Sequence, residues 1–216
     1  MKEFNLLRAT GIIACIAGIL LIIFVDNVKT SENFHIINDF IQNILVLNTV
    51  LLIFIPNNRR LKIALIIGVF IMLFDFIFET IAVYAGWWYP LGGIQFPPVL
   101  VLPLEMVISF LIIGTSTGLI LYLPNKIREM DFKAFNWLKP LVRNPKFDWF
   151  WRVLIILVLT VVSTLGDFTA GPEIWVRGPN WHPSFTFILN GWFYIGMLAL
   201  FLLYYLEKRI PEETSI

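Results

Sequence analysis

Long apolar runs alternate along the chain with short segments that carry most of the polar residues. A helix needs about 20 mostly apolar residues to cross the hydrocarbon core of a bilayer. A backbone exposed to lipid must satisfy its hydrogen bonds internally, so each run is expected to be a helix. Six runs are long enough: residues 6–25, 34–56, 61–84, 99–123, 151–167 and 183–206. The fifth is short and is expected to begin inside the preceding stretch FDWFWR.

This pattern predicts an all-α fold: a polytopic membrane bundle of about six transmembrane helices. Composition agrees, because only 14% of the residues are charged, against about 25% in soluble domains. No segment suits a soluble domain, so residues 1–216 are expected to form a single integral membrane domain. The first run is too long for a signal-peptide core and is interpreted as a retained span.

Net charge and cysteine content exclude several classes of protein. A formal charge of +1 argues against a nucleic-acid partner. Cys15 is the single cysteine, which leaves neither an internal disulfide nor a cysteine-based metal site. We expect it to be a buried structural thiol.

The distribution of Lys and Arg predicts the orientation in the membrane. All of the 16 basic residues except Lys29 and Arg177 fall on one side of the six spans. Basic residues mark the cytoplasmic side, so we expect a multi-pass protein of the cell membrane with both termini in the cytoplasm. The long cytoplasmic loop, residues 124–149, mixes bases with Phe, Trp and Leu. Such a segment lies on an anionic membrane surface or is a solvated basic linker, and both readings stay open.

Spans three and four contain three carboxyl groups, all in the half of the membrane that faces outward. Counting the helical rise from Tyr84 puts Glu79 roughly 7 Å and Asp75 roughly 13 Å below the outer end of span three. Span four runs inward from about Val99, which puts Glu105 roughly 9 Å deep. Asp75 and Glu79 are four residues apart and therefore share one helix face.

Charged residues in spans are costly and usually face the bundle interior, where they carry function. No Lys or Arg is adjacent in the sequence, so at least one of these acids is expected to be neutral at pH 7 and able to donate a proton, unless a cation binds there. We therefore take Glu105, Asp75 and Glu79 as the candidate catalytic residues. Further intramembrane polar residues are candidate substrate contacts or interhelical hydrogen-bonding groups: Asp39, Asn43, Asp167 and Asn190.

Two outward loops share a composition rich in Gly, Pro and Trp: GWWYPLGGIQFPP (residues 86–98) and FTAGPEIWVRGPNWHPSF (residues 168–185). An interfacial aromatic belt explains part of this composition. Alternatively, the loops fold back as aromatic lids over the acids, with Trp87, Trp88 and Trp175 contacting substrate. Pro97, Pro98 and Pro103 favour a bent or late-starting fourth helix.

The same loops suggest a weak internal repeat of helical hairpins. Spans three and four, and then spans five and six, each read as an acid, an aromatic Gly–Pro loop and an apolar helix. In that register Asn190 occupies the position of Glu105. Duplicated hairpins commonly place a site at the interface between the copies.

The order of Asp75, GWWY at residues 86–89 and LPLEM at residues 102–106 resembles the lycopene cyclase domain family. These are small polytopic membrane proteins of carotenoid synthesis whose pattern includes Leu-Pro-Leu-Glu-Glu. The resemblance implies a membrane enzyme that protonates and cyclises a polyene end group, an intramolecular lyase or isomerase, with Glu105 and Asp75 as acid candidates. Met106 stands in place of the family's second glutamate. The resemblance therefore implies the fold and an isoprenoid or lipid substrate.

The first functional hypothesis is a membrane enzyme that performs cofactor-independent acid–base chemistry on an apolar isoprenoid or lipid. Glu105 would donate the proton, and Asp75 and Glu79 would stabilise a carbocation or take the proton back. The indoles of Trp87, Trp88 and Trp175 would stabilise the cation through their π faces. No cofactor and no metal are expected, and association between copies of the chain stays open.

The second hypothesis is a transporter or binder that uses the same carboxylates as counter-charges for a cationic solute. A metalloenzyme is a third alternative, because His–x3–Asp is a workable ligand spacing. Its ligands would be His35, Asp39, Asp75, Glu79 and His182. A purely structural subunit is the fourth.

Overall fold

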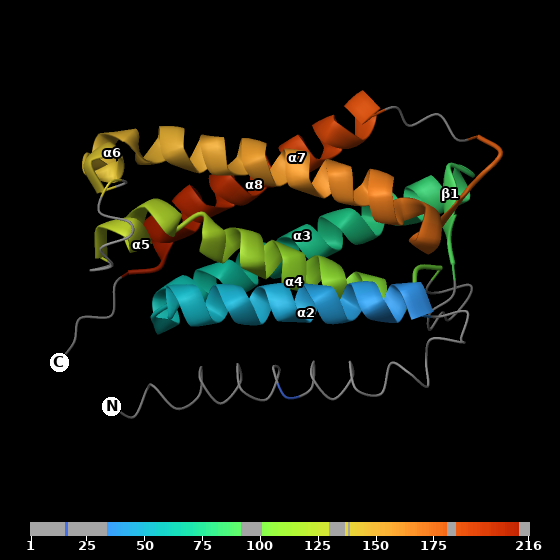
Figure 1. Ribbon diagram of the computed structural model, residues 1–216, viewed down its shortest axis with the longest axis horizontal. Helices are drawn as coiled ribbons and strands as arrows, with labels where there is room; N and C mark the ends of the chain where they lie inside the picture. The colour runs from blue at the N-terminus through green and yellow to red at the C-terminus, as the bar shows by residue number, and fades with distance from the viewer. Residues whose placement is uncertain are drawn as a thin grey trace.

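The computed structural model describes residues 34–91, 101–129, 139–180 and 185–211, together with residues 16 and 137. Five long helices lie side by side along the long axis of the molecule (Figure 1). They are α2 (Phe34–Phe54), α3 (Asn58–Tyr84), α4 (Leu104–Ile120), α7 (Asp148–Ile174) and α8 (Phe185–Arg209). Three short helices, α5 (Leu123–Glu129), α6 (Lys139–Val142) and η2 (Pro145–Phe147), lie at one end, called here the α5 end. Strands β1 (Trp88–Pro90) and β2 (Trp175–Arg177) lie at the opposite end, called the ribbon end.

These elements confirm the helical fold class, and several of the helices have the length and apolar character that suit a membrane protein. Within the described residues, three helical stretches are long and apolar enough to cross a membrane: Asn58–Tyr84, Pro145–Asp167 and Thr186–Arg209. Helix α4 with α5, bent by 48°, makes a fourth if the pair is one span, and Asn38–Phe54 in α2 is apolar but shorter. The prediction of six spans is therefore not confirmed. The first predicted span, residues 6–25, and Cys15 lie outside the described residues, except for Ile16.

Helix boundaries confirm two predictions and correct a third. Helix α4 begins late, at Leu104, with Pro103 as its N-cap, and α7 begins at Asp148 inside the aromatic stretch. However, α7 continues through residues 168–174, which were expected to be a loop. Pro172 lies in the last turn of this helix. The helix ends where strand β2 begins.

Small residues let α3 and α4 approach closely. A methyl group added at Gly114 would lie 2.9 Å from the Cα of Gly68, and one added at Gly118 would lie 3.1 Å from the Cα of Ala64. Stripes of small residues four apart are typical of tight helix pairs in membranes, because they allow backbones to meet. These contacts fix the register of the antiparallel pair. Counting outward from them puts Asp75 at the height of Val107, within a turn of Glu105.

The core lies between α3, α4 and α8. Ile63, Ile67, Leu119 and Leu203 are all 0% exposed within it. Asp75 continues the buried stripe of α3 that contains Gly68 and Ile71, so its carboxyl group points to the bundle interior. The outer surface of the bundle is apolar, as the exposed aliphatic side chains along α7 illustrate. Such a surface suits a lipid environment.

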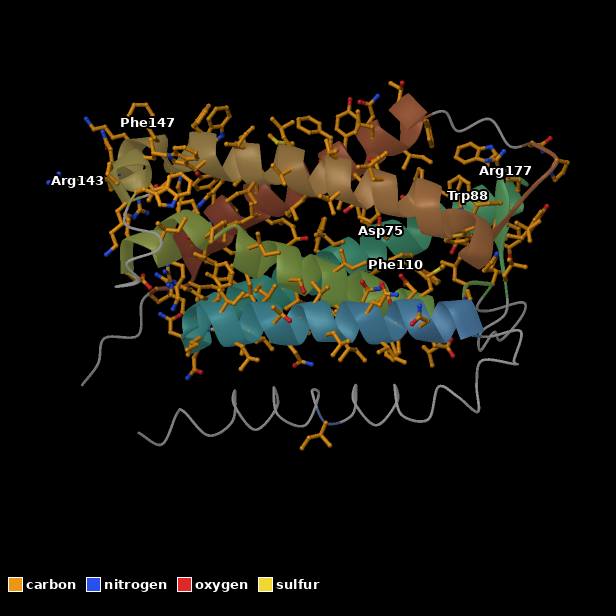
Figure 2. The ribbon with its side chains drawn as sticks, viewed as in Figure 1. Asp75, Trp88, Phe110, Arg143, Phe147 and Arg177 are labelled. Atoms are coloured by element: carbon orange, nitrogen blue, oxygen red, sulfur yellow. The ribbon has the colours of Figure 1, made fainter. Side chains whose placement is uncertain are left out.

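Ion pairs hold the helices together at the α5 end. Arg60 on α3 pairs with Glu129 on α5 at 2.7 Å, and Arg128 pairs with Asp148 at the start of α7 at 2.7 Å. Figure 2 shows Arg143 at this end and Arg177 at the ribbon end. The described basic residues other than Arg177 belong to segments at the α5 end, so the charge asymmetry read from the sequence is present in the folded chain.

Candidate acid–aromatic site

The loops that follow α3 and α7 meet in a two-stranded antiparallel ribbon. Trp88 pairs with Arg177, Tyr89 with Val176 and Pro90 with Trp175. One of the two interpretations of these loops was that they act alike as lids. The structure joins their described parts in one element that closes the end of the bundle.

Backbone contacts next to the ribbon depend on two glycines. Gly86 has φ of 70°, a left-handed conformation that favours glycine. The Gly178 amide donates to the Trp87 carbonyl at 2.9 Å, and a methyl group at Gly178 would collide with the Gly86 carbonyl. Asn180 ties the turn further, since its side-chain amide donates to the Ala85 carbonyl at 2.9 Å. This local order sets where the neighbouring indoles lie.

Aromatic rings from two helices, the turn after α3 and both strands gather next to the ribbon. The Trp88 ring lies 5.9 Å from the rings of both Trp87 and Trp175. Phe78 and Phe187 complete the group, with Phe187 stacked on Phe78 at 6.3 Å. We call these five residues the aromatic cluster. The three tryptophans were sequence candidates and the structure brings them together.

One carboxyl group is hydrogen-bonded to a ring of the aromatic cluster. The Trp88 indole nitrogen donates to Glu79 at 2.6 Å, and Asp75 lies one turn below Glu79 at 5% exposure. Glu79 therefore contacts the Trp88 indole directly, and Asp75 lies in α3 one turn farther from the ribbon; Figure 2 labels Asp75 and Trp88. A carboxyl group held beside rings and away from bulk water is suited to transferring a proton or to binding a cation.

Asp167 links these acids to the neighbouring helices. Its carboxyl group lies within electrostatic range of those of Asp75 and Glu79, and Asp39 lies within range of Asp167. Two of these acids are oriented by hydrogen bonds: Trp192 donates to Asp167 at 2.6 Å, and Asn43 donates to Asp39 at 3.1 Å. The site therefore draws carboxyl groups from α2, α3 and α7.

Two sequence candidates occupy more open positions. Glu105 lies in the first turn of α4 and is partly exposed, and Asn190 is exposed on α8. Sequence reasoning gave Glu105 the leading role and Asp167 a secondary one. Among the described residues, Asp167 on α7 lies within electrostatic range of acids on α2 and α3, and the roles of Glu105 and Asp167 stay predictions.

Sequence reasoning missed Phe78, Phe187 and Trp192, because their neighbours in the sequence are mostly apolar, as at lipid-facing positions of any transmembrane helix. Phe78 directly precedes Glu79, and Trp192 follows Asn190 by two residues. Proximity to a candidate polar residue was therefore the available signal. Sequence reasoning also missed that the exposed residue Arg177 pairs with Trp88 in the two-stranded ribbon.

The metal-site alternative rests partly on residues outside the described part of the chain. Within that part, no group of three or more His, Cys, Asp or Glu side chains is placed to hold a metal ion. His182 and the side chain of His35 lie outside it. The His-containing ligand set is therefore untested.

Comparisons with family models, curated proteins and solved structures find no match to this chain. The resemblance to the lycopene cyclase domain stays a prediction based on the motifs.

Proposed function

We propose that the protein is a membrane-embedded enzyme that performs cofactor-independent acid–base chemistry on an apolar isoprenoid or lipid. The observation that carries the proposal is the hydrogen bond between Trp88 and Glu79, which seats an acid against the aromatic cluster. The buried position of Asp75 one turn away adds a second proton-transfer group. The motif similarity to the lycopene cyclase domain supports the same class of substrate.

The proposed reaction begins with protonation of a carbon–carbon double bond by one of the α3 carboxyl groups, most simply Asp75. The proton forms a new C–H bond and leaves a carbocation on the neighbouring carbon. The π faces of Trp87, Trp88 and Trp175 stabilise that cation. A second carboxylate, Glu79, then removes a proton from an adjacent carbon and restores a double bond. The net result is isomerisation, or cyclisation where a second double bond attacks the cation first.

The substrate is proposed to enter sideways from the bilayer at the ribbon end. With the basic α5 end in the cytoplasm, the ribbon end faces outward and both termini lie in the cytoplasm. Terminal epitope tags should then be accessible to antibody only after the cells are permeabilised. Tags accessible in intact cells would contradict this orientation.

The central experiment compares lipid extracts of cells with and without the gene by liquid chromatography coupled to mass spectrometry, which separates isomers before they are detected. Wild-type protein should convert one apolar lipid into an isomer of equal mass. Removal of a general acid typically costs 10²–10⁴-fold in rate, so Asp75→Asn and Glu79→Gln should each abolish detectable product. Glu129→Gln, at the opposite end of the bundle, is the matched control and should retain activity.

Glu105→Gln tests the residue that the family resemblance favours. Loss of product from this variant alone would transfer the proton-donor role from Asp75 to Glu105. Unchanged turnover in all three acid variants would refute acid–base catalysis at this site.

A second candidate function, binding of a cationic solute, is supported by the combination of aromatic rings and carboxyl groups. Quaternary ammonium groups are recognised by aromatic rings, and carboxylates supply the counter-charge. Titration of purified protein with tetramethylammonium, followed by calorimetry and tryptophan fluorescence, tests it. Saturable binding that Glu79→Gln abolishes, with no lipid product in cells, would favour this function over the enzyme.

A further inference from the structure

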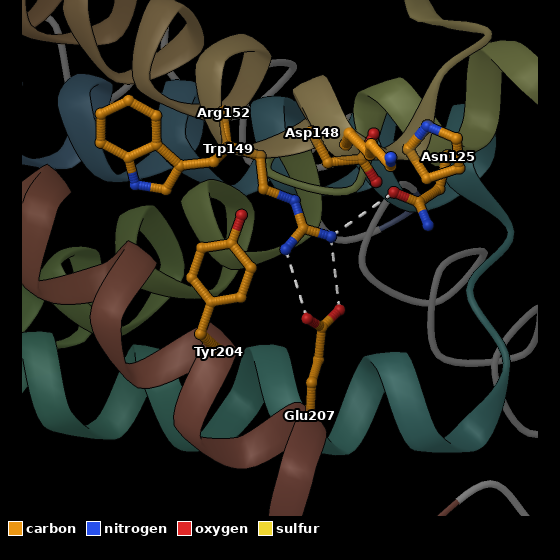
Figure 3. Close-up of a pocket in the computed structure, with 8 residues that line it drawn as sticks. Asn125, Asp148, Trp149, Arg152, Tyr204 and Glu207 are labelled. Atoms are coloured by element: carbon orange, nitrogen blue, oxygen red, sulfur yellow. Dashed lines mark hydrogen bonds and ion pairs between the residues drawn. The ribbon is translucent and has the colours of Figure 1, made fainter.

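A cavity of about 600 Å³ opens at the α5 end, far from the acid–aromatic site. Residues from α5, η2, α7 and α8 line it (Figure 3): Asn125, Pro145, Lys146, Asp148, Trp149, Arg152, Tyr204 and Glu207. None of these residues belongs to the function proposed above. The cavity is therefore an independent candidate site.

Arg152 is the buried cation of this cavity. Its side chain is only 3% exposed, and its Nη1 atom lies 3.2 Å from a Glu207 oxygen. The Nη2 contacts, to Glu207 and to the Asn125 carbonyl oxygen, are each 3.4 Å. Ideal charge-assisted bonds are about 2.7–2.9 Å. Its Nε–H has no hydrogen-bond partner within the described part of the chain, so this buried guanidinium retains donor capacity.

The charges around the cavity favour an anion. Asp148 is already held by two short bonds from Arg128, at 2.7 and 2.8 Å. Glu207 is shared with Arg152, and the exposed side chain of Lys146 adds a further positive charge. With Lys146, Arg128 and Arg152 set against Asp148 and Glu207, one positive charge is left over.

The backbone adds to this preference. Residues Asp148 and Trp149 begin the 27-residue helix α7 at the cavity wall. The N-terminus of a helix carries a partial positive charge that favours phosphate groups; the Asp148 amide already donates to the Pro145 carbonyl, and the Lys146 amide to the Asn144 side chain, so the backbone contributes through this charge. A phosphate would find a buried Arg, an exposed Lys and a helix N-terminus at one place.

The surroundings indicate where that phosphate comes from. Exposed aromatic side chains flank the cavity at Phe147, Trp149 and Phe150, as expected at the headgroup level of a bilayer. Beyond Arg152, α7 presents exposed Leu154, Leu157 and Val158, an apolar path along which acyl chains can lie. Soluble phosphate compounds have no acyl chains to lie along this apolar surface.

We propose that the cavity binds the phosphate of an anionic phospholipid, with its tails along the exposed face of α7. Basic pockets between transmembrane helices are a known type of lipid headgroup site. Lys146 and the Asn125 amide contact the phosphate oxygens, and the buried Arg152 guanidinium attracts them by its charge. Trp149 and Tyr204 enclose the headgroup.

The test uses purified full-length protein in a neutral detergent, with phosphatidylglycerol added to the micelles. Binding is followed by native mass spectrometry and by the unfolding midpoint. Phosphatidylglycerol should bind and raise the midpoint, and phosphatidylcholine should do so at least about tenfold more weakly. Equal binding of the two lipids would overturn the proposal.

Substitutions of charged residues test whether phosphatidylglycerol binds in this cavity. Lys146→Glu, at an exposed position that folding tolerates, should weaken phosphatidylglycerol binding about tenfold or more. Lys62→Glu, an exposed basic residue of the same end outside the cavity, is the control and should leave it unchanged. Equal effects of the two would show general surface attraction and overturn the proposal. The double variant Arg152→Met with Glu207→Gln removes both charges together and should lose the lipid effect if it still folds.

Inorganic phosphate and glycerol 3-phosphate distinguish the two sources of the phosphate group. Neither should raise the unfolding midpoint at millimolar concentration. If either reproduces the phosphatidylglycerol effect, and Lys146→Glu removes it, the site takes a soluble phosphate and the lipid assignment is wrong. All of these measurements are of binding, so their outcome is independent of whether the acid–aromatic site is catalytic.

Discussion

Trp88 on strand β1 donates its indole N–H to the carboxyl group of Glu79, one to two turns from the end of α3, at 2.6 Å. The bond connects the ribbon to the helix that carries two of the acids. The same indole packs at 5.9 Å from both Trp87 and Trp175. Through Trp88, the position of the ribbon therefore controls the orientation of an intramembrane acid.

Trp88→Phe tests this control, because it keeps an aromatic ring and removes the N–H. A hydrogen bond to a charged group contributes about 1.5–3 kcal/mol, so product formation or ligand binding should fall by roughly tenfold to a hundredfold. The variant should still unfold cooperatively in detergent. Trp137→Phe, at an exposed position of 67%, is the control. An effect no larger than that of the control would mean that the bond does not orient Glu79 for function.

Gly114→Ala tests the close approach of α3 and α4. The added methyl group would lie 2.9 Å from the Gly68 Cα, and a backbone cannot move aside as a side chain can. We expect a loss of about 1–3 kcal/mol, typical of overpacking, measured as a lower unfolding midpoint. At Gly191, in α8, an added methyl group meets nothing within 4 Å. Gly191→Ala should therefore be neutral or stabilising, by up to about 1 kcal/mol from helix propensity, and a lower midpoint for both variants would contradict the packing argument.

Gly86→Ala tests the turn that precedes the ribbon. A φ of 70° costs a residue with a Cβ about 1–2 kcal/mol. Asn enters this region more readily, so Gly86→Asn should cost less. Tryptophan fluorescence, which reports on the nearby indoles, should change more in the Ala variant, while far-ultraviolet circular dichroism stays constant in both. Identical spectra for the two variants would show that the turn does not set the indole positions.

Glu207→Gln and Glu129→Gln compare two ion pairs at the α5 end. Glu207 faces Arg152, which is 3% exposed. Its removal leaves a buried cation uncompensated and should cost about 3 kcal/mol. Glu129 faces a more exposed Arg60 and is itself 48% exposed, so its loss should cost less than about 1 kcal/mol. Denaturation in detergent compares the two, and the reverse order would contradict the burial of the Arg152 pair.

Local patterns in the sequence were sufficient for the helices and for some of the candidate residues. Hydropathy located α2, α3, α4, α7 and α8, because a run of apolar residues dictates an internally bonded backbone wherever it meets lipid. Spacing put Asp75 and Glu79 on one face of one helix. Pro103 fixed the late start of α4. Each of these features depends on residues within a few turns of one another.

Helix ends and short helices were less predictable. Gly171 and Pro172 suggested a loop, yet α7 continues to Ile174, because β2 pairing rather than local propensity sets where it ends. Helix α5 lies at the start of a stretch for which composition left two interpretations open, a solvated basic linker and a segment on the membrane surface. Its ion pairs with Arg60 and Asp148 stabilise it after folding.

The chemistry-bearing contacts join residues that are distant in the sequence. The sequence alone determined that acids and indoles occur in neighbouring segments, and that basic residues collect on one side. Only the tertiary structure decided that Gly178 reaches the Gly86 turn, that Asp167 acts on Asp75, and that Arg152 meets Glu207 beside a cavity. The physical reason is that hydropathy and helical period act within one segment, whereas these contacts follow from the register in which separate helices pack.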